Sequence, residues 1–313
     1  MDKELVIIGG GPSGVAASIY AARKKMDFIL VSMDIGGQVL TSGDIENYMG
    51  FKNIDGITFV QKLVDQLDYL GVSPVSAEVL DFRVVKEHEF AISLSNATTL
   101  KAKNVLICTG ADHKKLGVKG EEEGIGKGIS YCYTCDAPFY KNKNVMVVGG
   151  GNSGFEAAEQ LLNYASSIII VEYADKFKAD EALQNKVLKD PKIKTLTNHK
   201  VLEVYVDKNI GVTGVKLEDI KNGKAYDIQI EGIFVEIGTK PNTELFVNTG
   251  IKLNKWGEII IDQNNRTSLL GAYAAGDCTN IFAKQIITAA GEGTKALLSI
   301  HHDIVYGVSS WVG

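Results

Sequence analysis

Short apolar runs alternate with glycine-rich turns and amphipathic stretches along this chain of 313 residues. Residues 5–8 form one apolar run, a glycine-rich turn follows it, and residues 15–24 have the apolar spacing of a helix. The same order returns at residues 145–148, 149–154 and 155–164. A buried strand, a glycine turn and a helix in this order are typical of a nucleotide-binding βαβ unit. The pattern therefore predicts an α/β protein with two Rossmann-like nucleotide-binding domains.

The two glycine turns share the spacing Gly-x-Gly-x-x-Gly, and each position has a physical reason. Gly9 allows the tight turn, Gly11 lets a pyrophosphate approach the backbone, and Gly14 lets the helix pack against the strand. The amide groups at the start of the helix then attract the phosphate charge. A bare glycine turn is the alternative, and the flanking strand and helix argue against it. The second turn repeats the spacing at Gly149, Gly151 and Gly154.

The strand that follows each helix ends at a different kind of residue. Residues 28–31 are followed by Ser32 and Asp34, and Asp34 either bonds a ribose or lies in a turn. Residues 168–171 end at Glu172. An acid roughly 20 residues after the last glycine is expected to bond the ribose 2′-hydroxyl of NAD. The second turn is therefore predicted to bind a nicotinamide nucleotide.

The rest of the chain predicts smaller elements. Residues 57–70 form an amphipathic helix, and residues 75–100 alternate like an antiparallel meander. A strand at 105–110 contains Cys108, which we interpret as a small hydrophobic residue. Further expected elements are strands at 201–206, 212–217 and 228–235, linkers at 117–128 and 238–243, and a closing helix at 284–306.

Two polar segments could lie beside a flavin. A strand that ends at Gly276-Asp277 could aim its carboxylate at a ribityl chain, although Asp277 could equally be the N-cap of a helix. Residues 36–38 and 46–48 form a polar, glycine-bearing loop. Such a loop could wrap a flavin ring, whereas its composition alone indicates a plain turn.

Cys132 and Cys135 form a Cys-x-x-Cys pair, and Asp136 follows directly. This spacing suits a disulfide that opens and closes, and the acid could supply or take a thiol proton. A zinc site would need four ligands, but Cys108 and Cys278 stand alone. A thioredoxin domain would place the pair after its first strand, and an inert buried pair is a further alternative. Between two nucleotide turns, the pair predicts electron flow from a nicotinamide through a flavin to these sulfurs.

Composition narrows the class of protein. The length favours about two domains. A net charge of −5 and a pI near 5.6 argue against a nucleic-acid surface, which needs a basic footprint. We expect no membrane span, because no apolar run approaches the ~20 residues that one needs. The first residues lead straight into a strand without a secretory signal, and there are only 4 cysteines, so we expect a reducing cytoplasm.

Together the motifs resemble the low-molecular-weight thioredoxin reductase family over the whole chain. In family order they are Gly9-x-Gly11-Pro12-x-Gly14, Gly36-Gly37-Gln38, Glu46-Asn47, Cys132-x-x-Cys135-Asp136, the turn from Gly149 to Gly154, residues 238–243, Ala275-Gly276-Asp277 and Gln285-Ile286. Residues 176–183 and 276–293 are also similar to the flavoprotein component of alkyl hydroperoxide reductase. That protein has an extra N-terminal thioredoxin-like region, which this sequence is expected to lack.

The resemblance implies a homodimer with FAD and three-layer β/β/α domains, one inserted in the other. A discontinuous FAD domain would comprise residues 1–116 and 244–313, and an inserted NAD(P) domain residues 117–243. In the family, the cysteine matching Cys135 faces the flavin, the one matching Cys132 attacks the partner disulfide, and the residue matching Asp136 is the general acid/base. The inserted domain of such a protein rotates between flavin contact and partner contact.

The resemblance also implies two sets of binding residues. The FAD residues are Gly9, Gly11, Pro12, Ser13, Gly14, Ser32, Asp34, Gly36, Gly37, Gln38, Asn47, Thr109, Gly110, Gly276, Asp277, Lys284, Gln285 and Ile286. The NAD(P) residues are Gly149, Gly151, Asn152, Ser153, Gly154, Glu172, Tyr173, Lys178 and Gly238.

The sequence departs from the family at the expected 2′-phosphate site. Members that use NADPH have a His-Arg-Arg run and a further arginine, whereas the matching positions here are Glu172-Tyr173-Ala174 and Lys178. A carboxylate ~4 Å from a phosphate repels it by up to a few kcal/mol at an effective dielectric of 20. Lys176 and Lys178 either offset part of this repulsion or form a solvated face. We therefore predict NADH in preference to NADPH.

The leading hypothesis is an FAD enzyme that reduces the disulfide of a thioredoxin- or glutaredoxin-like protein. A related hypothesis is an electron donor to a peroxiredoxin system. A ferredoxin-linked reductase and a dithiol oxidase that passes electrons to oxygen are further enzyme alternatives. A flavoprotein that senses redox state without turnover is the alternative from another class, and the second nucleotide turn argues against it.

Overall fold

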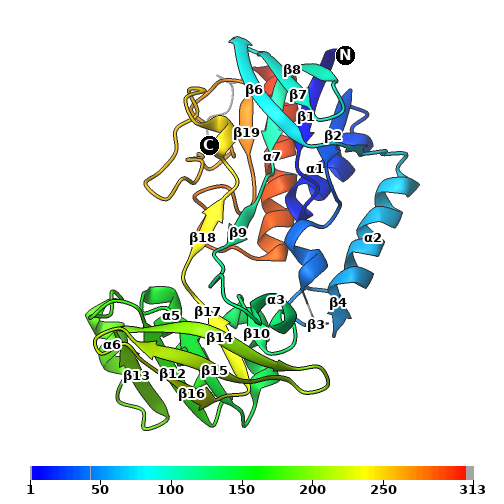
Figure 1. The fold of residues 1–313 in the computed structure, drawn as a ribbon. Coiled ribbons are helices and arrows are strands. Elements are labelled where there is room, and N and C mark those ends of the chain that lie inside the picture. Colours follow the sequence, from blue (N-terminus) through cyan, green and yellow to red (C-terminus); the bar gives the residue numbers. More distant parts are fainter. Residues whose placement is uncertain (1, 43, 308–313) are drawn as a thin grey trace. The chain divides into compact units, whose positions relative to one another are not determined.

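The computed structural model describes residues 2–42 and 44–307. Met1, Gly43 and residues 308–313, which include both ends of the predicted FAD domain, lie outside the described residues. The chain divides into two compact units (Figure 1). Unit 1 comprises Met1–Asp112 and Lys240–Gly313, and unit 2 comprises His113–Thr239. Unit 2 is therefore one continuous segment, whereas unit 1 is built from both ends of the chain.

Unit 1 contains a parallel sheet in the order β5-β2-β1-β8, with β19 beside β8. Its strands are β1 (Asp2–Ile8), β2 (Phe28–Ser32), β5 (Val75–Ser76), β8 (Thr99–Ile107) and β19 (Ala272–Ala274). Residues 5–8 of β1, residues 28–31 of β2 and all of β19 are apolar, as expected where both faces of a sheet are covered.

The strand β8 belongs to two layers of unit 1. Its second half pairs with β1 and β19, while its first half pairs with β7 (Glu89–Leu94) in an antiparallel meander. The meander continues from β7 to β6 (Val79–Lys86). Phe82 and Phe90 stack in the core between the meander and the sheet, with ring centroids 5.6 Å apart. The predicted meander at 75–100 is therefore present as β6 and β7 with the start of β8.

Three helices complete unit 1: α1 (Pro12–Arg23), α2 (Gly56–Tyr69) and α7 (Ile286–Tyr306). Alanines and glycines on α1 and α7 let these two helices cross closely. A Cβ atom at Gly293 of α7 would lie 1.9 Å from the carbonyl oxygen of Ser13 in α1. The helices, the parallel sheet and the meander thus form three layers (Figure 1).

A buried ion pair fastens α7 to this sheet. The Arg266 guanidinium donates two hydrogen bonds to the Asp303 carboxylate, at 2.8 and 2.6 Å, and the Tyr273 hydroxyl donates a third at 2.7 Å. These donors hold the pKa of Asp303 below its usual range despite burial.

The short elements of unit 1 are η1 (Gly37–Thr41), β3 (Asp44–Ile45), β4 (Ile54–Asp55) and η3 (Glu244–Phe246).

Unit 2 contains a parallel sheet in the order β10-β17-β11-β12-β13. Its strands are β10 (Ile129–Ser130), β11 (Asn144–Val148), β12 (Ser167–Glu172), β13 (Ile193–Thr197) and β17 (Gly232–Val235). This order places β12 and β13 on one side of β11, and β17 and β10 on the other. The point where the order reverses is where such sheets bind nucleotides.

Different layers cover the two faces of this sheet. One face packs on α5 (Asn152–Leu161) and α6 (Glu181–Val187), and the other on an antiparallel sheet. The antiparallel strands are β14 (His199–Asp207), β15 (Gly211–Asp219) and β16 (Lys224–Gln229). The remaining elements are α3 (Glu121–Gly124), α4 (Tyr133–Asp136) and η2 (Ala137–Tyr140), with β9 (Ala111–His113) and β18 (Thr239–Pro241), which pair with each other. The predicted fold class, α/β with two Rossmann-like domains, is confirmed.

Two expectations about local structure were wrong. Residues 228–235 are not one strand, because β16 pairs with β15 while β17 joins the parallel sheet. The chain changes sheets at residues 230–231, between them. Residues 117–128 are also more than a linker, because they contain α3 and the buried carboxylate of Glu121.

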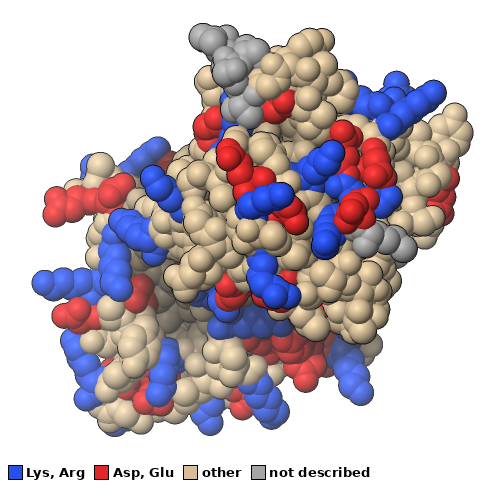
Figure 2. Space-filling model, turned by 90° about the horizontal axis from the view of Figure 1, so that it is seen from above, with Lys and Arg blue, Asp and Glu red and all other residues tan. Residues whose placement is uncertain are grey.

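The surface is charged in both signs. Figure 2 shows lysine and arginine side chains interspersed with acidic ones on the face that it draws. Among the described helices, none is both long and apolar enough to span a membrane.

Candidate active site

The first glycine turn has the geometry of a phosphate-binding loop. Gly9 has a φ of +108°, and a Cβ there would lie 2.2 Å from the carbonyl oxygen of Cys108. A Cβ at Gly14 would lie 1.9 Å from the carbonyl oxygen of Gly9. A Cβ at Gly11 would meet nothing within 4 Å, so this position is open. Pro12 is the first residue of α1, whose other early amides remain available to a phosphate.

The second glycine turn repeats this geometry. Gly149 has a φ of +127°, and a Cβ there would lie 2.2 Å from the carbonyl oxygen of Glu236. A Cβ at Gly154 would lie 1.9 Å from the carbonyl oxygen of Gly149, and one at Gly151 would again meet nothing within 4 Å. The first and last glycines of both turns thus have the steric roles that their spacing indicates, whereas the approach of a pyrophosphate to Gly11 and Gly151 stays a prediction.

In each turn, the residue at the end of the second strand accepts a hydrogen bond from the amide of the glycine directly after the first one, Gly10 or Gly150. In unit 1 the amide of Gly10 donates to the Ser32 hydroxyl at 2.8 Å. In unit 2 the amide of Gly150 donates to Glu172 Oε2 at 2.7 Å, and the amide of Ala174 donates to Oε1 at 2.8 Å. These donors fix the Glu172 carboxylate at the carboxyl end of β12 and leave lone pairs for ribose hydroxyls.

A cavity of about 210 Å³ lies beside Glu172 in unit 2. Its lining includes Gly149, Tyr173, Ile237 and the cations Lys115 and Lys200. The Lys115 ammonium pairs with Glu122 at 2.5 Å, and that of Lys200 pairs with Glu218 at 3.2 Å. Both lysines that line the cavity therefore already have a carboxylate partner.

The other predicted NAD(P) residues surround this turn with different functions. Asn152 exchanges two hydrogen bonds with Asp180, at 3.1 and 2.8 Å. The amide of Lys178 donates to the Gly150 carbonyl at 2.8 Å, while its side chain is exposed, like those of Tyr173 and Ser153. Gly238 accepts a hydrogen bond from the amide of Lys114 at 3.0 Å and lies outside this turn.

In unit 1, predicted FAD residues from both ends of the chain meet. A Cβ at Gly276 would lie 2.8 Å from the Ser13 hydroxyl, and one at Gly37 would lie 3.7 Å from Gly11 Cα. Asp34 accepts a hydrogen bond from the Gly37 amide at 3.1 Å. This contact agrees with the alternative that Asp34 lies in a turn. Gly36 lies in the same turn, with a φ of +110°.

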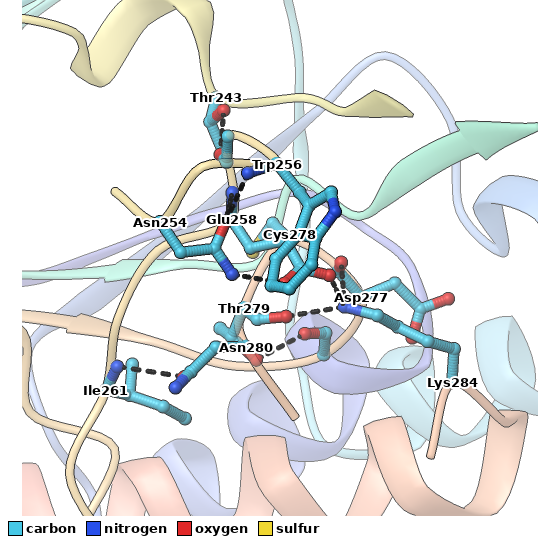
Figure 3. Close-up of polar contacts among 12 residues, drawn as sticks. Thr243, Asn254, Trp256, Glu258, Ile261, Asp277, Cys278, Thr279, Asn280 and Lys284 are labelled. Atoms are coloured by element: carbon cyan, nitrogen blue, oxygen red, sulfur yellow. Dashed lines mark hydrogen bonds and ion pairs between the residues drawn. The ribbon is translucent and has the colours of Figure 1, made fainter. Parts of the chain in front are cut away.

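The loop that ends in Asp277 is held by a lysine. The Lys284 ammonium forms an ion pair with Glu258 at 2.8 Å and donates to the carbonyl oxygens of Asp277 and Thr279 (Figure 3). Lys284 therefore orders the loop, and its predicted contact with FAD stays a prediction. Burial raises the pKa of Asp277, and its Oδ1 is buried without a hydrogen-bond partner among the described residues. An unpartnered buried acceptor beside an open glycine turn fits the hydroxyls of a ribityl chain.

Three further contacts order the predicted flavin loop. The Gln38 side chain donates to the Ala111 carbonyl, and the Asn47 side chain donates to Gln285 Oε1 at 3.2 Å. The Thr109 hydroxyl donates to the Asn242 carbonyl at 2.6 Å, beside Gly110. Gln285 is the N-cap residue of α7 and Ile286 its first residue. All of these residues belong to unit 1, as does the first glycine turn.

Cys132 and Cys135 form a disulfide at the start of α4. Both are half-buried. The Cys132 amide donates to the Ser130 hydroxyl at 3.1 Å, and the Cys135 amide lies 3.3 Å from Cys132 Sγ and points at it. A donor aimed at sulfur favours a thiolate at Cys132 over a thiol.

Asp136 lies next to this disulfide on α4. Burial raises the pKa of Asp136, and a hydrogen bond from Ser130 opposes part of that rise. Ser130 thus bonds both the Cys132 amide and the acid. A carboxyl group whose pKa is raised takes up a proton more readily than an exposed one, which suits an acid/base role next to the cysteines.

Several residues that order the site were not predicted as site residues. Ser130 directly precedes the redox motif, and Asn242 lies in the predicted turn at 238–243, so their places in the sequence could have identified them. No feature of the sequence pointed to Glu258. Glu121 accepts from the amides of Leu116 and Gly117 and from the Tyr131 hydroxyl, each at 2.7 Å. In the part of the chain that the structure describes, no cluster of His, Cys, Asp or Glu could hold a metal ion.

Comparison with known proteins agrees with this geometry. Residues 3–293 match the pyridine nucleotide-disulphide oxidoreductase family. The chain is 38% identical over 305 residues to the F component of alkyl hydroperoxide reductase from Staphylococcus aureus, and the match covers 96% of this chain and 59% of that protein. It is 37% identical over 300 residues to a Bacillus subtilis protein named NADH dehydrogenase, with 95% and 58% covered. The chain therefore spans about three fifths of the length of these relatives.

A solved structure matches over its full length. The thioredoxin reductase from Streptococcus pyogenes superposes with a TM-score of 0.90 and 31% identity, covering 97% of this chain and 98% of that one. Flavoproteins of this kind bind FAD and a nicotinamide nucleotide. The chain belongs to the pyridine nucleotide-disulphide oxidoreductase family, among its low-molecular-weight, thioredoxin reductase-like flavoenzymes.

Proposed function

We propose that this protein reduces the disulfide of a thioredoxin- or glutaredoxin-like protein, with electrons that pass from NADH through FAD to Cys132 and Cys135. The observation that carries the proposal is the Cys132–Cys135 disulfide next to half-buried Asp136, in the same unit as the Glu172-bearing nucleotide turn. A homodimer in the cytoplasm is part of the proposal, and it rests on the resemblance and on the sparse cysteines.

We assign FAD to unit 1 and the nicotinamide nucleotide to unit 2. In unit 1, the open turn at Gly11 suits the pyrophosphate, and the unpartnered Oδ1 of Asp277 suits the ribityl chain. Bound FAD would supply two-electron chemistry between the nicotinamide and the disulfide. In unit 2, the α5 N-terminus suits the pyrophosphate and Glu172 the adenosine ribose.

The reduced cysteines then perform the thiol chemistry. The Cys132 thiolate, stabilised by the Cys135 amide, attacks one sulfur of the partner disulfide, and the other partner sulfur leaves as a thiolate. The Cys135 thiolate attacks Cys132 Sγ, which re-forms the disulfide and releases the second partner sulfur. The two protons lost by the cysteines are those gained by the partner thiols, and Asp136 transfers them.

NADH is the proposed donor because of Glu172. Its carboxylate is held rigidly where the 2′-phosphate of NADPH would approach, and Lys115 and Lys200 are already paired with carboxylates. The name of the Bacillus subtilis relative, NADH dehydrogenase, agrees with this choice.

A second candidate function is electron donation to a peroxiredoxin system. The 38% identity to the F component of alkyl hydroperoxide reductase favours it. Parallel assays with thioredoxin, a glutaredoxin and a peroxiredoxin, each with and without a separate carrier, separate the two candidates by the rate of NADH oxidation.

Anaerobic titration of the purified yellow protein tests the proposal. NADH is expected to bleach the flavin absorbance on a stopped-flow timescale, and NADPH to do so more slowly. If reduced ferredoxin bleached the flavin and neither nicotinamide nucleotide did, the protein would be a ferredoxin-linked reductase. Rapid oxygen consumption with a dithiol and no nicotinamide would indicate a dithiol oxidase, and bleaching without turnover on any disulfide would indicate a sensor.

A further inference from the structure

Glu236 lies at the carboxyl end of β17, directly behind the second glycine turn. Its amide donates to the carbonyl of Val148, the last residue of β11, at 2.8 Å. Its own carbonyl oxygen is the atom that a Cβ at Gly149 would meet at 2.2 Å. The backbone of Glu236 therefore supports the first glycine of the nucleotide turn.

The carboxyl group of Glu236 is only partly satisfied. Its Oε1 is buried and has no hydrogen-bond partner among the described residues. The backbone amide of Tyr133 hydrogen-bonds to the carboxyl group, and the charge of Glu156 acts on it from α5. Burial raises the pKa of Glu236 to about 8. Buried polar atoms without a partner are uncommon in folded proteins, and a role in binding or catalysis is one recognised reason for them.

The strand order shows which part of a dinucleotide would lie near Glu236. Glu172 at the end of β12 marks the adenosine side of β11, and the turn after β11 marks the pyrophosphate. The other half of the dinucleotide must then extend across β17, on the opposite side of β11. Glu236 is the first residue after β17.

The redox pair lies at the same edge of this sheet. The strand β10 is the neighbour of β17, runs parallel to it, and leads from Ser130 through Tyr131 to Cys132. Tyr133, between the two cysteines, is the residue whose amide bonds Glu236. Glu236 therefore lies between the nucleotide turn and the residues of the Cys pair.

We propose that the Glu236 carboxyl group binds the nicotinamide riboside half of the dinucleotide, using its buried Oε1. The inference rests on the proposed function, because it requires unit 2 to take NAD(H). The chemistry available is a hydrogen bond from a ribose hydroxyl or from the carboxamide to Oε1. Glu236 thereby sets the position of the nicotinamide at the edge of the sheet that carries Cys132 and Cys135.

Calorimetric titration of the oxidised holoprotein with NAD⁺ and with ADP tests this assignment. ADP has the adenosine and pyrophosphate but lacks the nicotinamide riboside. Glu236→Ala is expected to weaken NAD⁺ binding by about tenfold, the effect of one hydrogen bond, and to leave ADP binding unchanged. Glu236→Gln, which keeps a side-chain oxygen and adds a donor, is expected to restore most of the NAD⁺ affinity.

Glu156→Gln is the matched control, because this neighbouring carboxylate already accepts from the Tyr133 hydroxyl at 3.0 Å. It is expected to bind both nucleotides like the unmodified chain. Equal losses for NAD⁺ and ADP in Glu236→Ala would overturn the inference and indicate a role in supporting Gly149. Unchanged NAD⁺ affinity would also overturn it. If the unmodified chain bound neither nucleotide, the nicotinamide assignment itself would be wrong.

Discussion

The two glycine turns of this protein have nearly the same backbone, yet they differ at the residue that ends the next strand. In both, an added Cβ at the last glycine would lie 1.9 Å from the carbonyl of the first, and the central glycine is open. In unit 1 the neighbouring side chain is the neutral hydroxyl of Ser32, whereas in unit 2 it is the carboxylate of Glu172. Both accept a hydrogen bond from the amide of the glycine that follows the first one.

This difference separates two properties of a nucleotide site. The glycines create space for a pyrophosphate, and the same space serves either nucleotide. Under the proposed assignment, the strand-end residue of unit 2 favours NADH over NADPH, because a carboxylate binds ribose hydroxyls and repels a 2′-phosphate, whereas a hydroxyl does neither strongly. The loops alone therefore identify dinucleotide sites, and the side chains around them identify the ligand.

The largest effect is expected from a substitution that stops the thiol chemistry of unit 2 and leaves FAD bound to unit 1. Cys135→Ser should abolish disulfide reduction, because no second sulfur remains to resolve the mixed disulfide. FAD content should stay unchanged, since the first glycine turn belongs to unit 1. Flavin absorbance and partner-thiol release measure the two properties. A mutant that still reduced its partner at the normal rate would contradict the proposed electron route.

Paired glycine substitutions should separate folding from binding in unit 1. Gly14→Ala places a methyl group 1.9 Å from the Gly9 carbonyl and should destabilise the fold by about 1–3 kcal/mol, as overpacking does. Gly11→Ala meets no protein atom within 4 Å and should leave apoprotein stability unchanged while it weakens FAD retention. Urea unfolding and flavin content provide the measurements. Equal destabilisation by both would show that Gly11 is structural.

The carbonyl that faces the first glycine belongs to Cys108 in unit 1 and to Glu236 in unit 2. Because Glu236 is an acid, the stability of unit 2 is expected to depend on pH. The pKa of Glu236 is raised to about 8 in the folded protein, from an ordinary value of 4.5. The folded state therefore keeps a proton that the unfolded state loses, and stability falls as pH rises between these two values. Glu236→Gln should be more stable than the unmodified chain at pH 8 by up to a few kcal/mol, and similar at pH 4.5. Denaturant unfolding at both pH values tests this, and a constant difference would contradict it.

A smaller effect is expected from making the second turn resemble the first. Glu172→Ser should reduce the preference for NADH over NADPH by about tenfold, or ~1.4 kcal/mol, because repulsion of the 2′-phosphate is lost. The ratio of kcat/KM for the two cofactors is the measurement. Lys189→Ala is the control, since this exposed lysine of unit 2 is not among the predicted NAD(P) residues. An unchanged ratio in Glu172→Ser would show that other residues select the cofactor.

Local patterns predicted much of this molecule, and the failures have physical causes. The nucleotide turns were predictable because each turn requires glycines at fixed spacings within six residues of sequence. The break between β16 and β17 was not, because apolar residues recur on both sides of it. Glu121 is one of three consecutive glutamates in a segment predicted to be a linker, and only the folded chain shows the amides that donate to it. The ion pair of Lys284 with Glu258 was not predictable, because the two residues are distant in sequence.

The meeting of Ser13 with Gly276 and Gly293 has a consequence for biosynthesis. A ribosome completes residues 113–239 before it has made α7, so unit 2 can fold while the chain is still attached. The helix α7, which completes unit 1, is made after unit 2. Under the proposed assignment, unit 1 can bind FAD only once α7 has been made, so a chain truncated within α7 should have a folded unit 2 and no flavin.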